Sequence, residues 1–188
     1  MSTVYLLPNS VDSSGSDWTN VGGTSADNSL TDDDADNYIK ATSDGLHNTF
    51  GLDDFKPAHF LITNVTHVFK AREVIRSGRY TITVAMINAA GSTLYSQSHT
   101  ENATADYNSE VGTTRTTSNG SSAWTKTDLA GLQLKITATD TSGDLRITYA
   151  ALRVLYEETR ADICGLDHDD VGNIIGKDHA AVDKVSGR

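Results

Sequence analysis

Residues 60–87 read FLITNVTHVFKAREVIRSGRYTITVAMI, the strongest strand pattern in the sequence. In its first half Val65, His67 and Phe69 alternate with their neighbours, as in a strand with one buried face. A Ser-Gly turn signal follows at residues 77–78. The second half alternates again and places four apolar residues on one face: Tyr80, Ile82, Val84 and Met86. The stretch therefore predicts two strands, each with one buried face, joined by a turn.

The same period of two residues returns downstream, where residues 132–138 alternate and residues 145–156 form the last and longest predicted strand. In that strand we expect two opposite faces, one with Thr148, Ala150, Leu152, Val154 and Tyr156 and the other with Ile147, Tyr149, Ala151 and Leu155. Shorter extended segments are predicted at residues 3–7, 38–41, 48–52, 93–95 and 113–117. We expect a long loop anchored by Trp18 before residue 38, and a short helical turn at residues 124–129.

About eight short strands with Gly, Asn and Ser turns between them, and no long amphipathic helix, are typical of an all-β fold. The sequence thus predicts an antiparallel β-sandwich, jelly-roll-like, over residues 1–157. Residues 158–188 are rich in Asp and Gly with isolated apolar residues, and they cannot build a core of their own. We interpret them as an irregular C-terminal arm, an assembly tail that docks on another protein.

The arm does not read as a coiled coil. Apolar residues recur at seven-residue spacing, but Asp178 interrupts that seam, and Gly172 and Gly176 each cost a helix roughly 1 kcal/mol. An extended arm is therefore favoured, with its apolar side chains as the partner-docking residues: Ile163, Leu166, Val171, Ile174, Ile175, Val182 and Val185.

Charge and composition exclude several classes of partner. The formal net charge is -10, whereas nucleic-acid binding is built from clustered Lys and Arg, so no nucleic acid is expected. Cys164 is the single cysteine, which rules out an intrachain disulfide. No secretory signal pattern and no run of about 18 apolar residues occurs, so we expect synthesis in a host cytoplasm and no membrane partner.

The residues that could carry chemistry form only weak patterns. Asp32, Asp34 and Asp36 have the spacing that opens a calcium loop, but Asn37 and Ser43 occupy the positions that need Gly and Glu. A solvated acidic loop is favoured over calcium, and no cofactor or other metal is expected. No nucleophile elbow, paired Glu motif or phosphate loop appears, so we expect no enzyme.

Two tryptophans offer aromatic surface, which carbohydrate-binding modules use as sugar platforms. Trp124 precedes a short turn and an apolar run, so a structural plug at the end of the sandwich is expected there. Trp18 lies in the predicted loop and is the possible glycan contact.

A series of short motifs resembles β-sandwich, jelly-roll-like structural proteins of tailed-phage virions. The motifs are Leu6-Leu7-Pro8, Trp18 followed by Val21-Gly22-Gly23, an acidic run before Tyr38-Ile39, a strand at residues 62–69, Trp124-Thr125 leading into Asp128-Leu129, and Ile175-Gly176-Lys177 near the end. This resemblance covers nearly the whole chain. Such proteins serve as capsid cement or decoration proteins, head fibres, neck proteins and tail-fibre modules.

The resemblance implies a non-enzymatic structural protein located in the virion, first of all a capsid cement or decoration protein that binds and stabilises the assembled head. Its partners would be the major capsid protein or other virion proteins, and it would form a homo-oligomer, with a trimer favoured. The alternatives are a neck, head-fibre or tail-fibre adaptor module, or a glycan-binding, receptor-binding sandwich.

Overall fold

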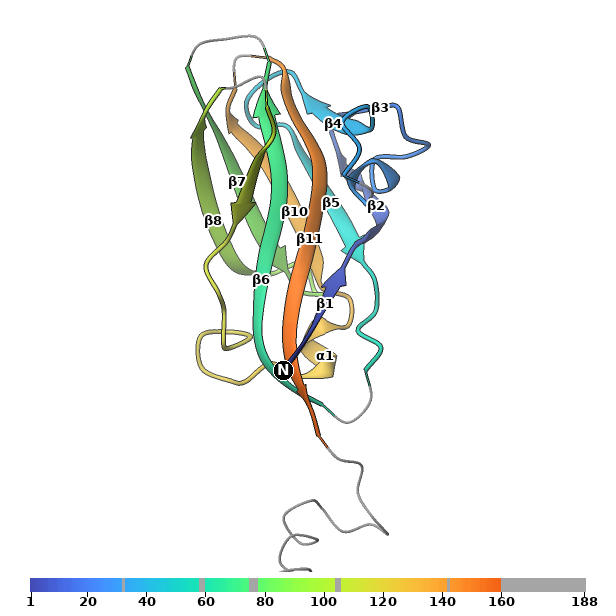
Figure 1. Ribbon diagram of the computed structural model, residues 1–188, viewed down its shortest axis with the longest axis vertical. Helices are drawn as coiled ribbons and strands as arrows, with labels where there is room; N and C mark the ends of the chain where they lie inside the picture. The colour runs from blue at the N-terminus through green and yellow to red at the C-terminus, as the bar shows by residue number, and fades with distance from the viewer. Residues whose placement is uncertain (32, 58–59, 75–77, 104–105, 142, 160–188) are drawn as a thin grey trace, which may run out of the picture.

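The computed structural model describes residues 1–159 apart from 32, 58–59, 75–77, 104–105 and 142, and it describes only the backbone of residues 13–16. The described chain forms two packed sheets (Figure 1). The front sheet, which faces the viewer in Figure 1, contains β3 (Thr19–Val21), β4 (Tyr38–Ala41), β11 (Leu145–Glu158), β6 (Phe60–Glu73) and β9 (Asn108–Val111), with β1 (Ser2–Leu6) also paired to β11. The back sheet contains β2 (Pro8–Ser16), β5 (His47–Leu52), β10 (Gln133–Asp140), β7 (Arg79–Ile87) and β8 (Thr93–Asn102).

The order of the strands is that of a jelly roll. The front sheet contains β4-β11-β6-β9 and the back sheet contains β5-β10-β7-β8, all in antiparallel pairs. Eight strands that alternate between two sheets in this order make two Greek keys, the definition of the jelly roll. The predicted fold class, an antiparallel β-sandwich that is jelly-roll-like, is confirmed.

The N-terminal segment departs from the prediction. β2 pairs with β5, and β3 pairs with β4, in the region predicted as one long loop. The sequence of β2 is rich in Ser, Asp and Gly and has a low β-propensity, so it did not predict a strand. Pairing with β5 makes it extended, because the context of the sheet overrides propensity. A short 3-10 helix, η1 (Asn28–Leu30), follows and packs on β11 and β4.

The strand β11 contains an irregularity that changes which residues face the core. The pairing register of β11 with β6 shifts between Ile147 and Tyr149. As a result Leu145 and Ile147 share the buried face with Ala150, Leu152 and Val154, all at 0% exposure. The prediction that Ile147 faces away from Ala150 was wrong because a bulge resets the two-residue alternation.

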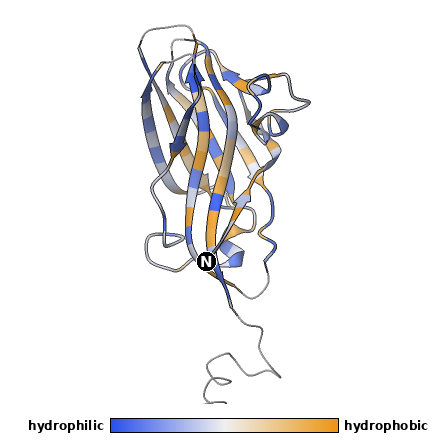
Figure 2. Ribbon diagram, in the orientation of Figure 1, coloured by the Kyte–Doolittle hydropathy of each residue, from blue (hydrophilic) through white to orange (hydrophobic). Residues whose placement is uncertain are grey.

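Apolar and polar residues alternate along the strands (Figure 2), and the apolar ones line the core between the sheets. Trp124 is 3% exposed, and its indole Nε1 donates to the carbonyl oxygen of Arg115 at 2.9 Å, so its role as a plug is confirmed. The helical turn predicted after it is α1 (Lys126–Leu129). Thr125 caps that turn, and its side chain and the Asp128 side chain each bond to the other's backbone N–H.

Residues 113–117 are not the strand that the sequence predicted. The neighbouring strand of the front sheet is β9, at residues 108–111. Residues 113–117 form only isolated β-bridges, Val65 with Arg115 and Thr117 with Ala123. In the described chain no helix has the length and apolar content to cross a membrane.

Residues 160–188, with all seven predicted docking residues, lie outside the described residues, so the division at residue 157 stays a prediction.

Candidate binding site

A groove of about 320 Å³ lies on the outer face of the front sheet. Its floor and walls come from four strands and the loop after η1: Tyr5, Asp33, Val68, Lys70, Val111, Tyr149 and Arg153. The strand registers make these side chains neighbours, because Tyr5 pairs with Arg153, Tyr149 with Lys70, and Val68 with Val111. The bulge in β11 contributes directly, since it turns Tyr149 and Arg153 to the outer face.

The apolar part of the groove is built from tyrosine and valine. Tyr5 is 46% exposed and Val111 is 54% exposed, both unusually open for large apolar side chains. Tyr149 is half-buried, and desolvation raises the pKa of its phenol, with a smaller contribution from Tyr5. The phenol is neutral at physiological pH, so its hydroxyl can donate a hydrogen bond beside an exposed apolar wall.

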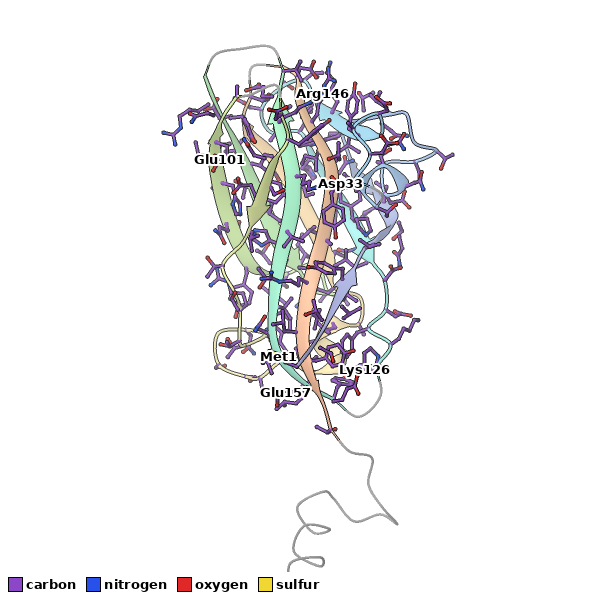
Figure 3. The ribbon with its side chains drawn as sticks, in the orientation of Figure 1. Met1, Asp33, Glu101, Lys126, Arg146 and Glu157 are labelled. Atoms are coloured by element: carbon purple, nitrogen blue, oxygen red, sulfur yellow. The ribbon has the colours of Figure 1, made fainter. Side chains whose placement is uncertain are left out.

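The charged part of the groove has one ion pair and one cation without a partner. Lys70 on β6 bonds to Asp33, whose backbone has a φ of 55° in the loop after η1. Figure 3 shows Asp33 beside β11, on the viewer's side of the sheet. Arg153 has no carboxylate partner among the described residues, and its Nε is a buried donor without a hydrogen bond.

A row of cations lies farther along the same face, at the end of the sheet where Figure 3 labels Arg146. Arg146 donates to both carboxylate oxygens of Asp144 at 2.8 and 2.7 Å, and Lys40 Nζ lies 3.2 Å from the same carboxylate. The hydrogen bonds from Arg146, together with those from Lys40, hold the pKa of Asp144 below its usual value despite burial. Arg146 also lies over the ring of Tyr38 at 4.6 Å, and Arg72 over Tyr107 at 4.3 Å.

The predicted glycan contact does not belong to this groove. Trp18 is 4% exposed, its Nε1 donates to the carbonyl oxygen of Leu46 at 2.9 Å, and its backbone N–H donates to Asn48 Oδ1 at 3.1 Å. The expectation that Trp18 is an open loop platform was therefore wrong. The loop that should have exposed it contains β2 and β3, which anchor the indole in the core.

The calcium candidates are only partly described. Asp36 donates its backbone N–H to Asp34 Oδ1 at 3.0 Å, which is a local turn, while Asp32 lies outside the described residues. Within the described ranges no group of three or more His, Cys, Asp or Glu side chains is placed to hold a metal ion.

Sequence reasoning missed the groove because no motif marks it. Tyr149 and Arg153 were recognisable as outward residues of a long strand, but their proximity to Tyr5 depends on a pairing between the two ends of the described chain. The available signal was that Tyr149 and Arg153 carry polar groups on one face of a long strand, opposite the apolar residues Ala150 and Leu152.

No protein family and no curated protein matches the sequence. Solved structures match it at low similarity. A carbohydrate-binding module of family 22, from Xyn10B of Clostridium thermocellum, matches with a TM-score of 0.42 and 12% identity over 78% of this chain and 94% of the module. An arabinose-bound α-L-arabinofuranosidase matches with a TM-score of 0.45 and 9% identity, over 91% of this chain and 29% of its own.

The enzymatically active domain of tailspike protein 4 from bacteriophage CBA120 matches with a TM-score of 0.41 and 9% identity, over 82% of this chain and 19% of its own. The chain thus spans less than a third of the arabinofuranosidase and of the tailspike chain. These similarities assign the chain to no family.

Proposed function

We propose that the protein is a non-enzymatic binding module that holds a saccharide in the groove on the front sheet. One observation carries the proposal: the groove combines open tyrosine and valine surface with fixed charged groups, all on neighbouring strands. A sugar ring presents C–H groups on its faces and hydroxyls at its edge. A small site with apolar walls and a few placed polar groups fits both parts.

The rigidity of the site supports binding. Tyr5, Lys70, Tyr149 and Arg153 all stand on paired strands, so their positions are set by the sheet. A preorganised site loses less conformational entropy when a ligand binds. Both carboxylates of the groove have a neighbour in the protein: Asp33 pairs with Lys70, and Glu110 lies 3.5 Å from His99 Nδ1. A catalytic acid or base must be available to the substrate, so these contacts favour binding over hydrolysis.

A second proposal is that the protein is a structural component of a tailed-phage virion, first of all a capsid cement or decoration protein. Its support is exposed apolar surface at the end of the sandwich where β11 ends. Leu61 is 53% exposed and Met1 is 77% exposed, and Figure 3 places Met1 near Glu157 at that end. Exposed apolar side chains near each other favour contact with another protein, here the major capsid protein or a further copy of the chain.

The two proposals separate experimentally through Tyr5 and Leu61, which are comparably exposed on one sheet. We expect Tyr5→Ala to remove binding on a glycan array, while Leu61→Ala, outside the groove, leaves it unchanged. Circular dichroism checks that both variants fold. Array binding that survives Tyr5→Ala would contradict the groove as the saccharide site.

For the virion proposal, quantitative mass spectrometry of purified particles measures the copy number of the chain against the major shell protein. Hundreds of copies are expected of a cement protein, and about a dozen of a neck or fibre protein. Absence from the particle would contradict any virion role.

A further inference from the structure

The groove contains a guanidinium group that the protein itself leaves unmatched. Arg153 is half-buried in the middle of β11, between its register partners Tyr5 on β1 and Thr66 on β6. Neither partner carries a negative charge. Its Nε is shielded from solvent and makes no hydrogen bond within the described structure.

Every other cation on this face of the described sheet has a partner. Lys70 pairs with Asp33, Lys40 and Arg146 pair with Asp144, and Arg72 lies over Tyr107. Arg153 is thus the exception. The chain has 25 acidic residues and 15 basic residues, so carboxylates that could pair with an arginine are abundant.

We infer that Arg153 is the recognition residue for a carboxylate on the bound saccharide, so that the ligand is an acidic sugar such as a uronic or sialic acid. This inference rests on the proposed saccharide binding and specifies its ligand class. The terminal N–H groups of a guanidinium form a planar fork that matches the two oxygens of a carboxylate. A ligand carboxylate would supply the negative charge that no described carboxylate gives to Arg153.

The surroundings of Arg153 favour a ligand with isolated carboxylates over a polyanion. Tyr5 and Tyr149 line the same groove as Arg153 and offer apolar surface for the sugar ring. Lys70, the other cation of the groove, is already neutralised by Asp33. The net charge of the chain is -10, so a densely sulfated chain or a nucleic acid would be repelled at long range.

The test compares paired glycans on one array, each acidic member printed beside its carboxyl-reduced neutral counterpart, which keeps the same ring. The wild-type protein should prefer the acidic members by about ten- to a hundredfold, the range expected for a hydrogen bond to a charged group. Arg153→Met keeps the aliphatic stem and should remove that preference, so that binding of the acidic members falls to the level of their neutral counterparts. Arg79→Met makes the same change at an exposed position on β7 and should leave the preference intact.

Thermal unfolding separates recognition from a structural role. Since Nε has no partner in the free protein, Arg153→Met should unfold at the wild-type temperature or above it. Equal binding of acidic and neutral members would overturn the inference and leave the saccharide proposal standing. A parallel loss of both in Arg153→Met would also overturn it, and no binding to any glycan by the wild-type protein would overturn both proposals.

Discussion

The Nε2 atom of His67 lies 2.8 Å from the Nε2 atom of His99, and this contact joins the two sheets inside the sandwich. On the other side of the second ring, His99 Nδ1 lies 3.5 Å from a carboxylate oxygen of Glu110. Two neutral imidazoles can share one proton across this distance, whereas two imidazolium ions would repel each other. The pair is therefore a buried polar contact that requires neutral histidines.

Acidification should destabilise the protein through this pair. Burial, with smaller contributions from His99 and Arg115, lowers the pKa of His67 from 6.5 to about 3, and burial also lowers the pKa of His99. Between pH 6.5 and pH 3 the unfolded chain binds a proton at residue 67 that the folded chain does not bind, and His99 contributes in the same direction. Stability is thus complete above pH 6.5 and falls as the pH decreases, by about 1.4 kcal/mol per pH unit for each fully shifted histidine.

Urea unfolding at a series of pH values measures this slope. Glu110 opposes it in part, because burial and the neighbouring Glu101 raise its pKa, and a raised carboxyl pKa makes the folded state gain stability as the pH falls. The double variant His67→Leu/His99→Leu should flatten the profile between pH 6.5 and 4. An unaltered slope in the double variant would contradict this account.

The position beside the pair should accept only glycine. A Cβ atom at Gly112 would overlap the imidazole ring of His67. The backbones of the two residues are also joined, because the N–H of Gly112 donates to the carbonyl oxygen of His67 at 2.9 Å. We expect Gly112→Ala to displace the ring and to lower the free energy of unfolding by about 1–3 kcal/mol, the usual cost of overpacking. Gly78→Ala is the control, because a Cβ there meets no atom within 4 Å. Equal urea midpoints for the two variants would show that His67 relaxes freely.

This histidine contact illustrates what the sequence could and could not predict. The alternation that places His67 beside Val65 and Phe69 on a buried face is local, and the prediction of that face is confirmed by their burial. The partner His99 is 32 residues away on the other sheet, and no periodic pattern links the two. The groove has the same origin, since Tyr5 meets Arg153 through pairing between β1 and β11.

The local errors also have physical causes. The prediction placed Ile147 on the face opposite Ala150, but the bulge in β11 puts both on the buried face. One extra residue in a strand turns every later side chain to the other face of the sheet. The strand at residues 8–16 was missed because its sequence is typical of turns and is extended only through pairing with β5. Strand alternation was thus predictable wherever the pattern was continuous, and contacts between strands were not.

The carboxylate of Asp144 should matter more than most surface charges. It is 4% exposed and accepts bonds from both Arg146 and Lys40, so Asp144→Asn leaves two cations without their anion. We expect a loss of about 2 kcal/mol in urea unfolding at pH 7, between the values for exposed and buried pairs. Because the pKa of Asp144 is lowered, its contribution in the wild type persists down to pH 3.8 and disappears below.

The control for Asp144 is Asp54→Asn. Asp54 also pairs with a lysine, Lys56, but both side chains are more than 70% exposed. Solvent screens such a pair, so no measurable change is expected. If both variants unfold at the same urea concentration, the Asp144 cluster does not stabilise the fold.

Replacing Trp18 should damage the fold and spare the groove. Trp18→Ala removes a buried indole and leaves the carbonyl oxygen of Leu46 without its donor, so we expect a loss of about 3–5 kcal/mol in urea unfolding. Trp18→Phe retains most of the apolar volume and loses the hydrogen bond, for a cost of about 1–2 kcal/mol. On the glycan array, the folded fraction of Trp18→Phe should bind as the wild type does, in contrast to Tyr5→Ala. A Trp18→Phe protein that is as stable as the wild type but binds no glycan would instead make Trp18 the sugar platform and require that the N-terminal strands open around it.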